Sequence, residues 1–382
     1  MSPWNSPEKI LCIRPDNMGD VLMSSPAIRA LKESFNCSIT LLTSSMGRTI
    51  APYLPAVDEY IIWDAPWVKG TKPLDVVEVN NIIDKLKQQR FDAAVIFTVF
   101  SQNPLPTAML ASAAEIPRRL AYCRENPYHL LTHWIPDEEP YEYVRHQVRR
   151  DLDLVRAIGA DTMDDSIIIK APARQTEALR KLTAAGLDIA KPWLVLHPGV
   201  SEIKRQYPAG QWIHVGKKID VELGYQMVVT GVEKERPLAA AIAEAIGHNA
   251  YNLAGAFSVE ELISLIGLAP LLVSVNTGTV HIASAMQTPV IVLYALTNPQ
   301  HAPWKCKGVV LPFSVADHMQ SRNAVLRYVQ ETHYKQQYSV SPDKIFAACQ
   351  MLLGEEEKPM IGELVLPDID AASRKQECPE LQ

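Results

Sequence analysis

The chain has 382 residues, of which 47% are hydrophobic and 21% are charged. This is a globular composition, and the length exceeds what one hydrophobic core usually serves, so we expect two domains. The formal net charge is −6, and residues 355–382 hold eight acids against three bases, so the rest is nearly neutral and lacks the basic surface expected of a nucleic-acid binder.

The first half of the chain alternates short apolar runs with amphipathic segments. We predict strands at residues 10–13, 39–42, 60–62 and 93–97, and helices near 48–54 and at 75–89. Residues 20–35 form either a helix capped at Ser24-Ser25-Pro26, preceded by a short helical turn, or one longer helix kinked at Pro26. After Pro117 the pattern weakens, and only a helix at 145–158 and a strand at 167–169 are predicted.

A second series of similar length follows a polar helix near residues 172–181. Its predicted strands are 193–196, 227–230, 271–275 and 290–294, and its predicted helices are 212–221, 237–246, 259–267, 280–286 and 342–353. Alternating strands and helices indicate parallel sheets covered on both faces, so we predict two doubly wound α/β domains that face each other. Such folds bind ligands at the carboxyl ends of their strands, here between the domains.

Familiar sequence motifs for several enzyme classes are missing. The chain has no G-x-G-x-x-G, no G-x-x-x-x-G-K-[ST], no H-E-x-x-H and no G-x-S-x-G. This argues against a dinucleotide-dependent dehydrogenase, a P-loop kinase, a zinc protease and an α/β-hydrolase.

The first loop of interest, residues 14–20, ends in Gly19-Asp20. It places a carboxylate at a helix N-terminus and at the functional edge of the predicted sheet. Asp20 is either a reactive acid or a residue that only stabilises the helix dipole, and this loop by itself favours the dipole role.

The second loop, residues 197–208, follows a predicted strand and contains Ser201, Lys204 and Arg205. Its two cationic side chains are suited to holding phosphate oxygens, or they form an ordinary solvated basic pair.

The third loop, residues 274–281, leads from a buried strand into a helix through Asn276, Thr277 and Gly278. Backbone N–H groups at residues 277–279 would bind an anion there, unless Asn276 or Thr277 only caps the helix and His281 only fills the core. Taken together, the three loops favour a diphosphate site.

At these loops the chain resembles glycosyltransferase family 9, the heptosyltransferase family, in residues 10–32, 197–208 and 271–289, and the likeness extends over roughly residues 9–353. The resemblance implies the GT-B fold, in which two Rossmann-like domains enclose the active site. It also implies an inverting, metal-independent transfer of a sugar, here a heptose, from an ADP-linked or similar nucleotide-diphosphate donor to a hydroxyl of a lipopolysaccharide core or similar glycan.

The resemblance also implies roles for individual residues. Asp20 corresponds to the general base, and the donor pyrophosphate is held by Lys204 and by Thr277, Gly278 and His281. An acid after Gly231, either Glu233 or Glu235, would contact the nucleoside, with Phe257 packing on the base. The remaining donor-site residues that we expect are Ser201, Arg205 and Asn276.

Two positions depart from the family pattern. Asn276 stands where many members have Asp, which removes a negative charge beside the diphosphate. The stretch 204–208 is one residue longer than the usual Lys-Arg-Trp-Pro, so Arg205 can share the role of Lys204. Two other functions stay open, a sugar-nucleotide epimerase or hydrolase of GT-B type and a non-catalytic sugar-nucleotide-binding protein.

We expect residues 1–172 to form the acceptor-binding domain, 173–354 the donor-binding domain and 355–382 a disordered acidic tail. The scattered cysteines and the absence of an apolar leader or membrane span predict a reduced cytoplasmic protein that needs no metal or cofactor. A cluster of arginines binds an anionic acceptor, contacts the inner membrane as a peripheral patch or forms a solvated surface. It consists of Arg118, Arg119, Arg124, Arg145, Arg149 and Arg150.

Overall fold

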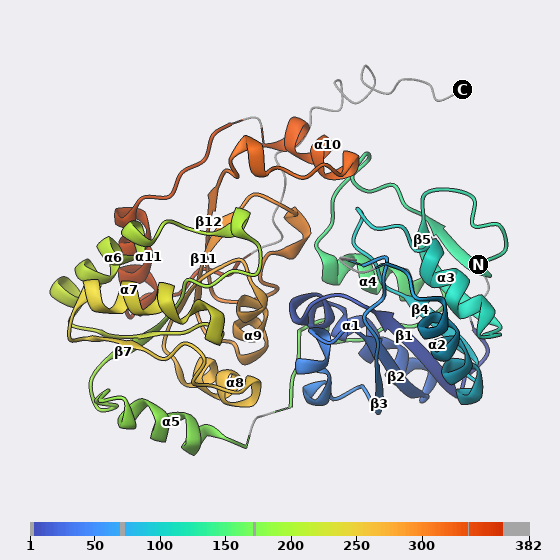
Figure 1. Ribbon diagram of the computed structural model, residues 1–382, viewed down its shortest axis with the longest axis horizontal. Helices are drawn as coiled ribbons and strands as arrows, with labels where there is room; N and C mark the ends of the chain where they lie inside the picture. Colours follow the sequence, from blue (N-terminus) through green and yellow to red (C-terminus); the bar gives the residue numbers. More distant parts are fainter. Residues whose placement is uncertain (1–3, 69–72, 171–172, 335, 362–382) are drawn as a thin grey trace.

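The structure, a computed structural model, describes residues 4–68, 73–170, 173–334 and 336–361. They form two units, each built on a parallel sheet of six strands (Figure 1). This confirms the predicted fold class, two Rossmann-like doubly wound domains. Of the predicted disordered tail, residues 362–382 lie outside the described part, whereas Ile361 N–H donates to Cys306 O and Met360 pairs with Lys307.

The first sheet has the strand order β3-β2-β1-β4-β5-β6. Its strands are β1 (Lys9–Arg14), β2 (Ser38–Thr43), β3 (Glu59–Ile62), β4 (Ala93–Ile96), β5 (Arg118–Cys123) and β6 (His133–Pro136); its helices are α1 (Met18–Phe35), α2 (Val76–Gln89), α3 (Leu105–Ala113) and α4 (Gln147–Arg156). Alternate residues of β1 enter different hydrophobic clusters, Ile10 and Cys12 in one and Leu11 and Ile13 in another. Both faces of the sheet are therefore covered, as its continuous apolar runs require.

The second sheet has the equivalent order β12-β11-β10-β7-β8-β9. Its strands are β7 (Trp193–His197), β8 (Gln226–Val229), β9 (Ala250–Asn252), β10 (Leu272–Val275), β11 (Val290–Ala295) and β12 (Gly308–Phe313); its helices are α5 (Gln175–Ala184), α6 (Ala209–Lys218), α7 (Arg236–Ile246), α8 (Val259–Leu268), α9 (Gly278–Met286), α10 (Ala324–His333) and α11 (Pro342–Leu353). Within the described residues, no helix is long and apolar enough to cross a membrane.

Helix α1 is one continuous helix with Pro26 inside it, so the predicted cap at residues 24–26 is wrong. Pro26 has no N–H to donate to the carbonyl of Leu22, but the hydroxyl of Ser25 donates to that oxygen at 2.7 Å and replaces the missing bond. Ser24 is fully buried and donates to Asp151 of α4. The serines therefore serve the interior of the helix rather than its start.

Two further predictions are corrected by the structure. Residues 167–169 form no strand; Ile167 and Ile169 are buried by packing in a hydrophobic cluster without pairing to a sheet. The helix predicted near 48–54 is a pair of short 3₁₀ turns, Gly47–Thr49 and Ala51–Tyr53, because Pro52 cannot donate the bond that would continue a helix.

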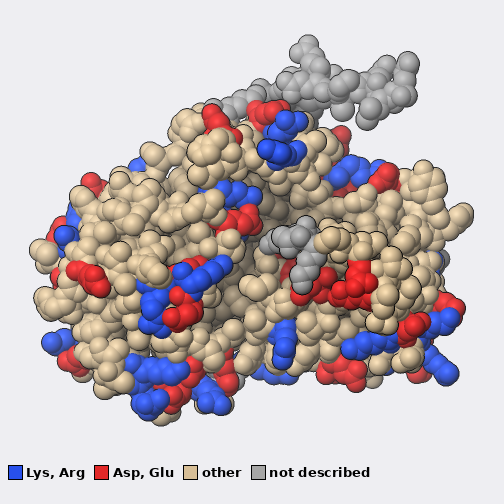
Figure 2. Space-filling model, viewed as in Figure 1, with Lys and Arg blue, Asp and Glu red and all other residues tan. Residues whose placement is uncertain are grey.

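The two units meet through the segment that follows β11. Gln300 is fully buried there; its side chain accepts from the N–H of Phe100 and donates to Glu139, both in the first unit. His146 at the start of α4 contacts Ala302 O at 2.7 Å. Helix α10 bridges the top of the view in Figure 1, where Asn323 before it bonds Ser101 O and Tyr328 packs on Tyr141. Below α10 the surface is hollowed between the two halves (Figure 2).

Candidate active site

Asp20 lies in the first turn of α1, at the carboxyl end of β1. Its Oδ2 accepts the N–H of Asn17 at 3.2 Å, and its Oδ1 lies 3.4 Å from Nη2 of Arg14. The side chain is only 15% exposed, whereas that of Arg14 is fully buried. Burial alone would lower the pKa of Arg14, but the carboxylates of Asp16, Asp20 and Asp151 raise it overall. A charged guanidinium thus holds the Asp20 carboxylate in place.

The N-termini of α1 and α9 meet across the two units. A Cβ added to Gly19 would lie 2.9 Å from the ring of His281, and one added to Gly278 would lie 2.5 Å from Met18 Cε. This contact brings Asp20 beside the sequence Thr277-Gly278. Both glycines are needed for close approach rather than for their backbone angles.

The N-terminus of α9 offers fewer donors than the sequence suggested. Thr277 N–H donates to Val275 O at 2.8 Å, so it does not serve as an anion donor. The N–H groups of Gly278 and Thr279 remain, because the first turn of a helix gives them no acceptor within the helix. His281 is buried, which lowers its pKa to about 3 and keeps the ring neutral.

Asn276 joins the ends of two neighbouring strands. Its amide nitrogen donates to Ala295 O at 3.3 Å, and its amide oxygen accepts from Ala295 N at 3.1 Å. An aspartate in the same place would have no proton for the Ala295 carbonyl. The side-chain amide of Asn276 therefore matches both backbone groups of Ala295 in β11, whereas a carboxylate would match only the N–H.

The second loop places its cations at the edge of the same hollow. Arg205 donates to Asn276 O at 3.1 Å, and Lys204 forms an ion pair with Glu202 at 2.8 Å. Lys204 also lines a small hollow with Thr297 and with Gln330 of α10. Ser201 is exposed at the turn before them. The structure thus brings Asp20, Arg205, Asn276, Gly278 and His281 together, with Lys204 beside them.

The two acids after Gly231 differ in position. Glu233 is largely exposed and forms a bidentate ion pair with Arg236 on its own turn. The carboxylate of Glu235 instead lies against Gly199 and Gly231, at the ends of β7 and β8; a Cβ on Gly199 would meet its Oε2 at 2.1 Å. Glu235 therefore lies against the ends of β7 and β8, whereas Glu233 lies against Gly255, which follows β9. Phe257 is partly buried near the ammonium group of Lys181.

Sequence reasoning missed His301, which follows β11. Its Nε2 lies 3.6 Å from Asp20 Oδ1, and burial lowers its pKa to about 4. His301 is 281 residues away from Asp20 in sequence, and no motif connects them. The only usable signal was that residues 293–299, just before His301, lie in the part of the chain that resembles the family.

The arginines proposed for membrane contact all have partners within the protein. Arg150 is fully buried between Asp137 and Glu139, and Arg145 pairs with Glu139 and Asp153. Arg118 and Arg119 donate to backbone carbonyls, while Arg124 and Arg149 pair with Asp137 and Asp165. These residues do not form a free basic patch.

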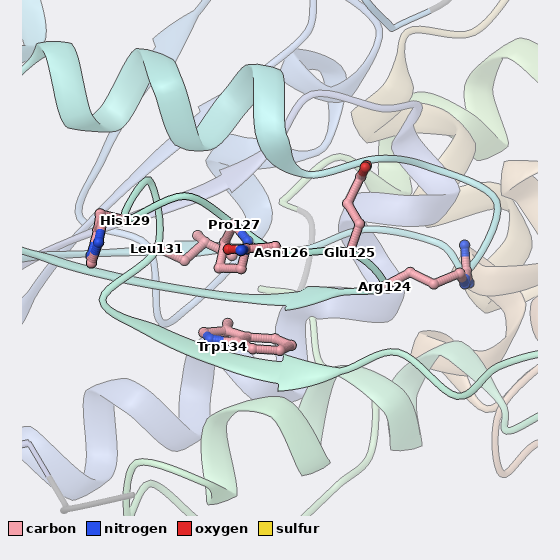
Figure 3. A pocket seen from close by; sticks show the side chains of 7 residues that line it. All are labelled: Arg124, Glu125, Asn126, Pro127, His129, Leu131 and Trp134. Atoms are coloured by element: carbon pink, nitrogen blue, oxygen red, sulfur yellow. The ribbon is translucent and has the colours of Figure 1, made fainter. Parts of the chain in front are cut away.

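A separate hollow of about 450 Å³ lies between the loop after β5 and strand β6 (Figure 3). The indole of Trp134, 38% exposed, forms one side, and Asn126, Pro127 and Leu131 lie opposite. Arg124 stands at one end and also donates to Phe100 O, next to the Gln300 contact. The hollow therefore begins near the contact between the two units.

Comparisons with known proteins agree with this geometry. A family model described as glycosyltransferase family 9 (heptosyltransferase) matches residues 79–330. A lipooligosaccharide heptosyltransferase 2 of Haemophilus influenzae is 26% identical over 309 residues, which cover 77% of this chain and 85% of that protein.

Among solved structures, a family 9 glycosyltransferase of Veillonella parvula superposes with a TM-score of 0.71 at 17% identity, covering 91% of this chain and 97% of that one. The ADP-heptose LPS heptosyltransferase II of Escherichia coli gives a TM-score of 0.66 at 20% identity, covering 90% and 98%. At these identities the superpositions show a shared fold.

Proposed function

This chain belongs to glycosyltransferase family 9, the heptosyltransferase family, and from that membership we propose that it transfers a heptose from ADP-heptose to a hydroxyl of a lipopolysaccharide core, with inversion and without a metal ion. The observation that carries the proposal is the Asp20 carboxylate, held by Arg14 in the turn of α1 that packs against the N-terminus of α9. The proposed donor, ADP-heptose, and the proposed acceptor, a lipopolysaccharide core, follow from the names of the relatives.

The proposed chemistry follows from the charges around the hollow. Asp20 takes the proton of the acceptor hydroxyl as its oxygen attacks the anomeric carbon from the face opposite the diphosphate. The leaving diphosphate gains negative charge, which Lys204, Arg205 and the N–H groups of Gly278 and Thr279 offset. These donors are fixed before the reaction, so little reorganisation is needed. An epimerase or hydrolase would not need an acceptor, and family membership disfavours both.

The direct test is a transfer assay. The purified protein is incubated with ADP-heptose and with lipopolysaccharide from a strain that lacks core heptose, in the presence and absence of EDTA. We expect a heptosylated product and ADP, unchanged by EDTA. Turnover of the donor without acceptor would support a hydrolase or epimerase instead, and ADP binding without any turnover would support a non-catalytic protein.

Replacing Lys204 with alanine is expected to lower kcat/KM for the donor by about 10- to 100-fold, because a hydrogen bond to a charged group contributes roughly 1.5–3 kcal/mol. Lys217→Ala, which removes an exposed cation from α6, is the matched control and is expected to change nothing. Donor titrations at saturating acceptor measure the effect. Equal behaviour of the two variants would remove Lys204 from the donor site.

The hollow beside Trp134 suits the sugar chain of the acceptor, because an exposed indole beside polar side chains offers an apolar face and hydrogen bonds together. Trp134→Ala is expected to raise KM for the lipopolysaccharide acceptor several-fold and to leave KM for ADP-heptose unchanged. Tyr128→Ala, an exposed aromatic on the same loop that does not line the hollow, is the control. An unchanged acceptor KM in the tryptophan variant would contradict this assignment.

A further inference from the structure

His301 and Asp20 come from different units and lie side by side where the two units meet. Asp20 is on α1, His301 is on the segment after β11, and Nε2 is 3.6 Å from Oδ1. Both side chains are mostly buried, 15% and 19% exposed. Within that separation one proton bound between them would draw the two atoms into a hydrogen bond.

The tautomer of His301 follows from its neighbour Asn298. The side-chain oxygen of Asn298 accepts the N–H of Gln300 at 3.0 Å, so its NH₂ group faces the histidine, 3.3 Å from Nε2. Nε2 is then an acceptor, and the ring proton sits on Nδ1. The neutral ring therefore carries no proton on Nε2, and a proton passed from Asp20 would take the lone pair that accepts from Asn298.

The charged and titratable groups around His301 pull in opposite directions. Burial is the largest influence and lowers the pKa of the ring; Asp20 raises it, whereas Arg205, Arg14 and His146 lower it. His281 of α9 also feels the charge of His301. A bound diphosphate would add negative charge on the same side as Arg205, which favours the imidazolium ion.

We propose that Asp20 and His301 act as one proton-accepting pair, and this proposal rests on the transfer reaction proposed above. The acceptor oxygen forms its bond to the anomeric carbon, and the bond from that carbon to the phosphate oxygen breaks with its electron pair leaving on the diphosphate. The acceptor's proton moves to Asp20 and on to Nε2 of His301. This second transfer restores the carboxylate, and the imidazolium ion returns to the neutral ring when it loses the proton to solvent as the products leave.

The contact between Asp20 and His301 depends on the docking of the two units. Gln300 and Ala302, on either side of His301, are bonded to Glu139 and His146 of the first unit. His301 therefore reaches Asp20 only while the two units are docked. The proton-accepting pair is therefore assembled only when the units are docked, an arrangement that excludes bulk water.

The pair is tested first by NMR on the protein alone, which needs no catalytic activity. Nitrogen-15 spectra of the histidine rings, assigned with His301→Gln, are expected to show the Nδ1–H tautomer of His301. Its pKa is expected to fall further in Asp20→Asn, because the neighbouring negative charge is lost. A His301 resonance that titrates identically with and without the Asp20 carboxylate would overturn the pairing, even if the protein proves to be a transferase.

The second measurement is kinetic. His301→Asn is expected to lower kcat by about 10- to 100-fold, with KM for ADP-heptose within twofold, and to move the acid limb of the kcat profile to lower pH. His214→Asn, an exposed histidine on α6, is the control. A purely structural role would lower kcat without moving the limb, and a donor-binding role would raise KM; either result contradicts the pair. If the wild-type protein transfers no heptose while the NMR coupling is present, the proposed function fails and the pair stands.

Discussion

Asp20→Asn is expected to lower the transfer rate by about 10²- to 10⁴-fold, the range that a positioned general base contributes. Asparagine has nearly the same shape and still accepts the N–H of Asn17, so the start of α1 should persist. It cannot take a proton from the acceptor hydroxyl. The thermal stabilisation of the protein by ADP should remain close to that of the wild type, because the groups proposed to bind the diphosphate, Lys204, Arg205 and the N-terminus of α9, belong to the other unit.

Asp75→Asn gives a matched control for this experiment. Asp75 also lies at a helix start, where its side chain accepts from Val77 and Glu78 at the N-terminus of α2, and asparagine caps equally well. We expect full activity from that variant. Transfer by Asp20→Asn at more than about a tenth of the wild-type rate would show that another group accepts the proton.

Arg150→Ala is expected to destabilise the first domain by about 3–5 kcal/mol, because it removes the fully buried cation between two buried carboxylates, which keep only longer ion pairs to Arg124 and Arg145. Arg150 donates to Asp137 and Glu139, each at 2.7 Å, and to Thr98 O at 3.0 Å, and all three charged side chains are at most 4% exposed. Unfolding in urea, followed by tryptophan fluorescence, measures the loss.

Arg156→Ala on the same helix is the comparison. Its partners Asp153 and Asp161 are partly or largely exposed, so its removal should change the free energy of unfolding by less than about 1 kcal/mol. A similar small loss in Arg150→Ala would mean that Arg124 and Arg145 are sufficient partners for Asp137 and Glu139, or that these acids take up protons. The same variant tests the domain contact, since Glu139 also binds Gln300.

The sequence was most informative where both faces of a strand are buried. β1, β7, β10 and β11 are continuous apolar runs between turn residues, and each was predicted within one or two residues of its observed bounds. β9 has three half-buried residues, β6 contains His133 and Pro136, and β12 contains Pro312, so none of these edge strands has a strong pattern. These strands form because they pair with a neighbouring strand, and that pairing cannot be recognised from a short stretch of sequence.

The same division holds for the candidate site. Asp20, Lys204 and Gly278 lie in the segments that lead from a strand into the next helix, and the sequence predicts them as site residues. Arg14 was read as part of a loop, and its full burial between carboxylates is a tertiary property. His301 lies beside Asp20 only because the two units dock, so its neighbour could not be predicted from sequence. Glu235 and Glu233 are equivalent in sequence, and only their packing distinguishes them: Glu235 lies against Gly199 and Gly231, and Glu233 lies against Gly255.

The segment after β11 also bears on the construction of hybrid enzymes. Residues 298–304 belong to the second sheet by connectivity, but Gln300, Ala302 and Trp304 bond to Glu139, His146 and Asp165 of the first domain. A chimera that exchanges the second domain for that of a relative would replace this segment and leave those three partners mismatched. A chimera that keeps residues 298–304 together with the first domain should preserve these bonds. The best exchange boundary therefore differs from the connection between the two sheets.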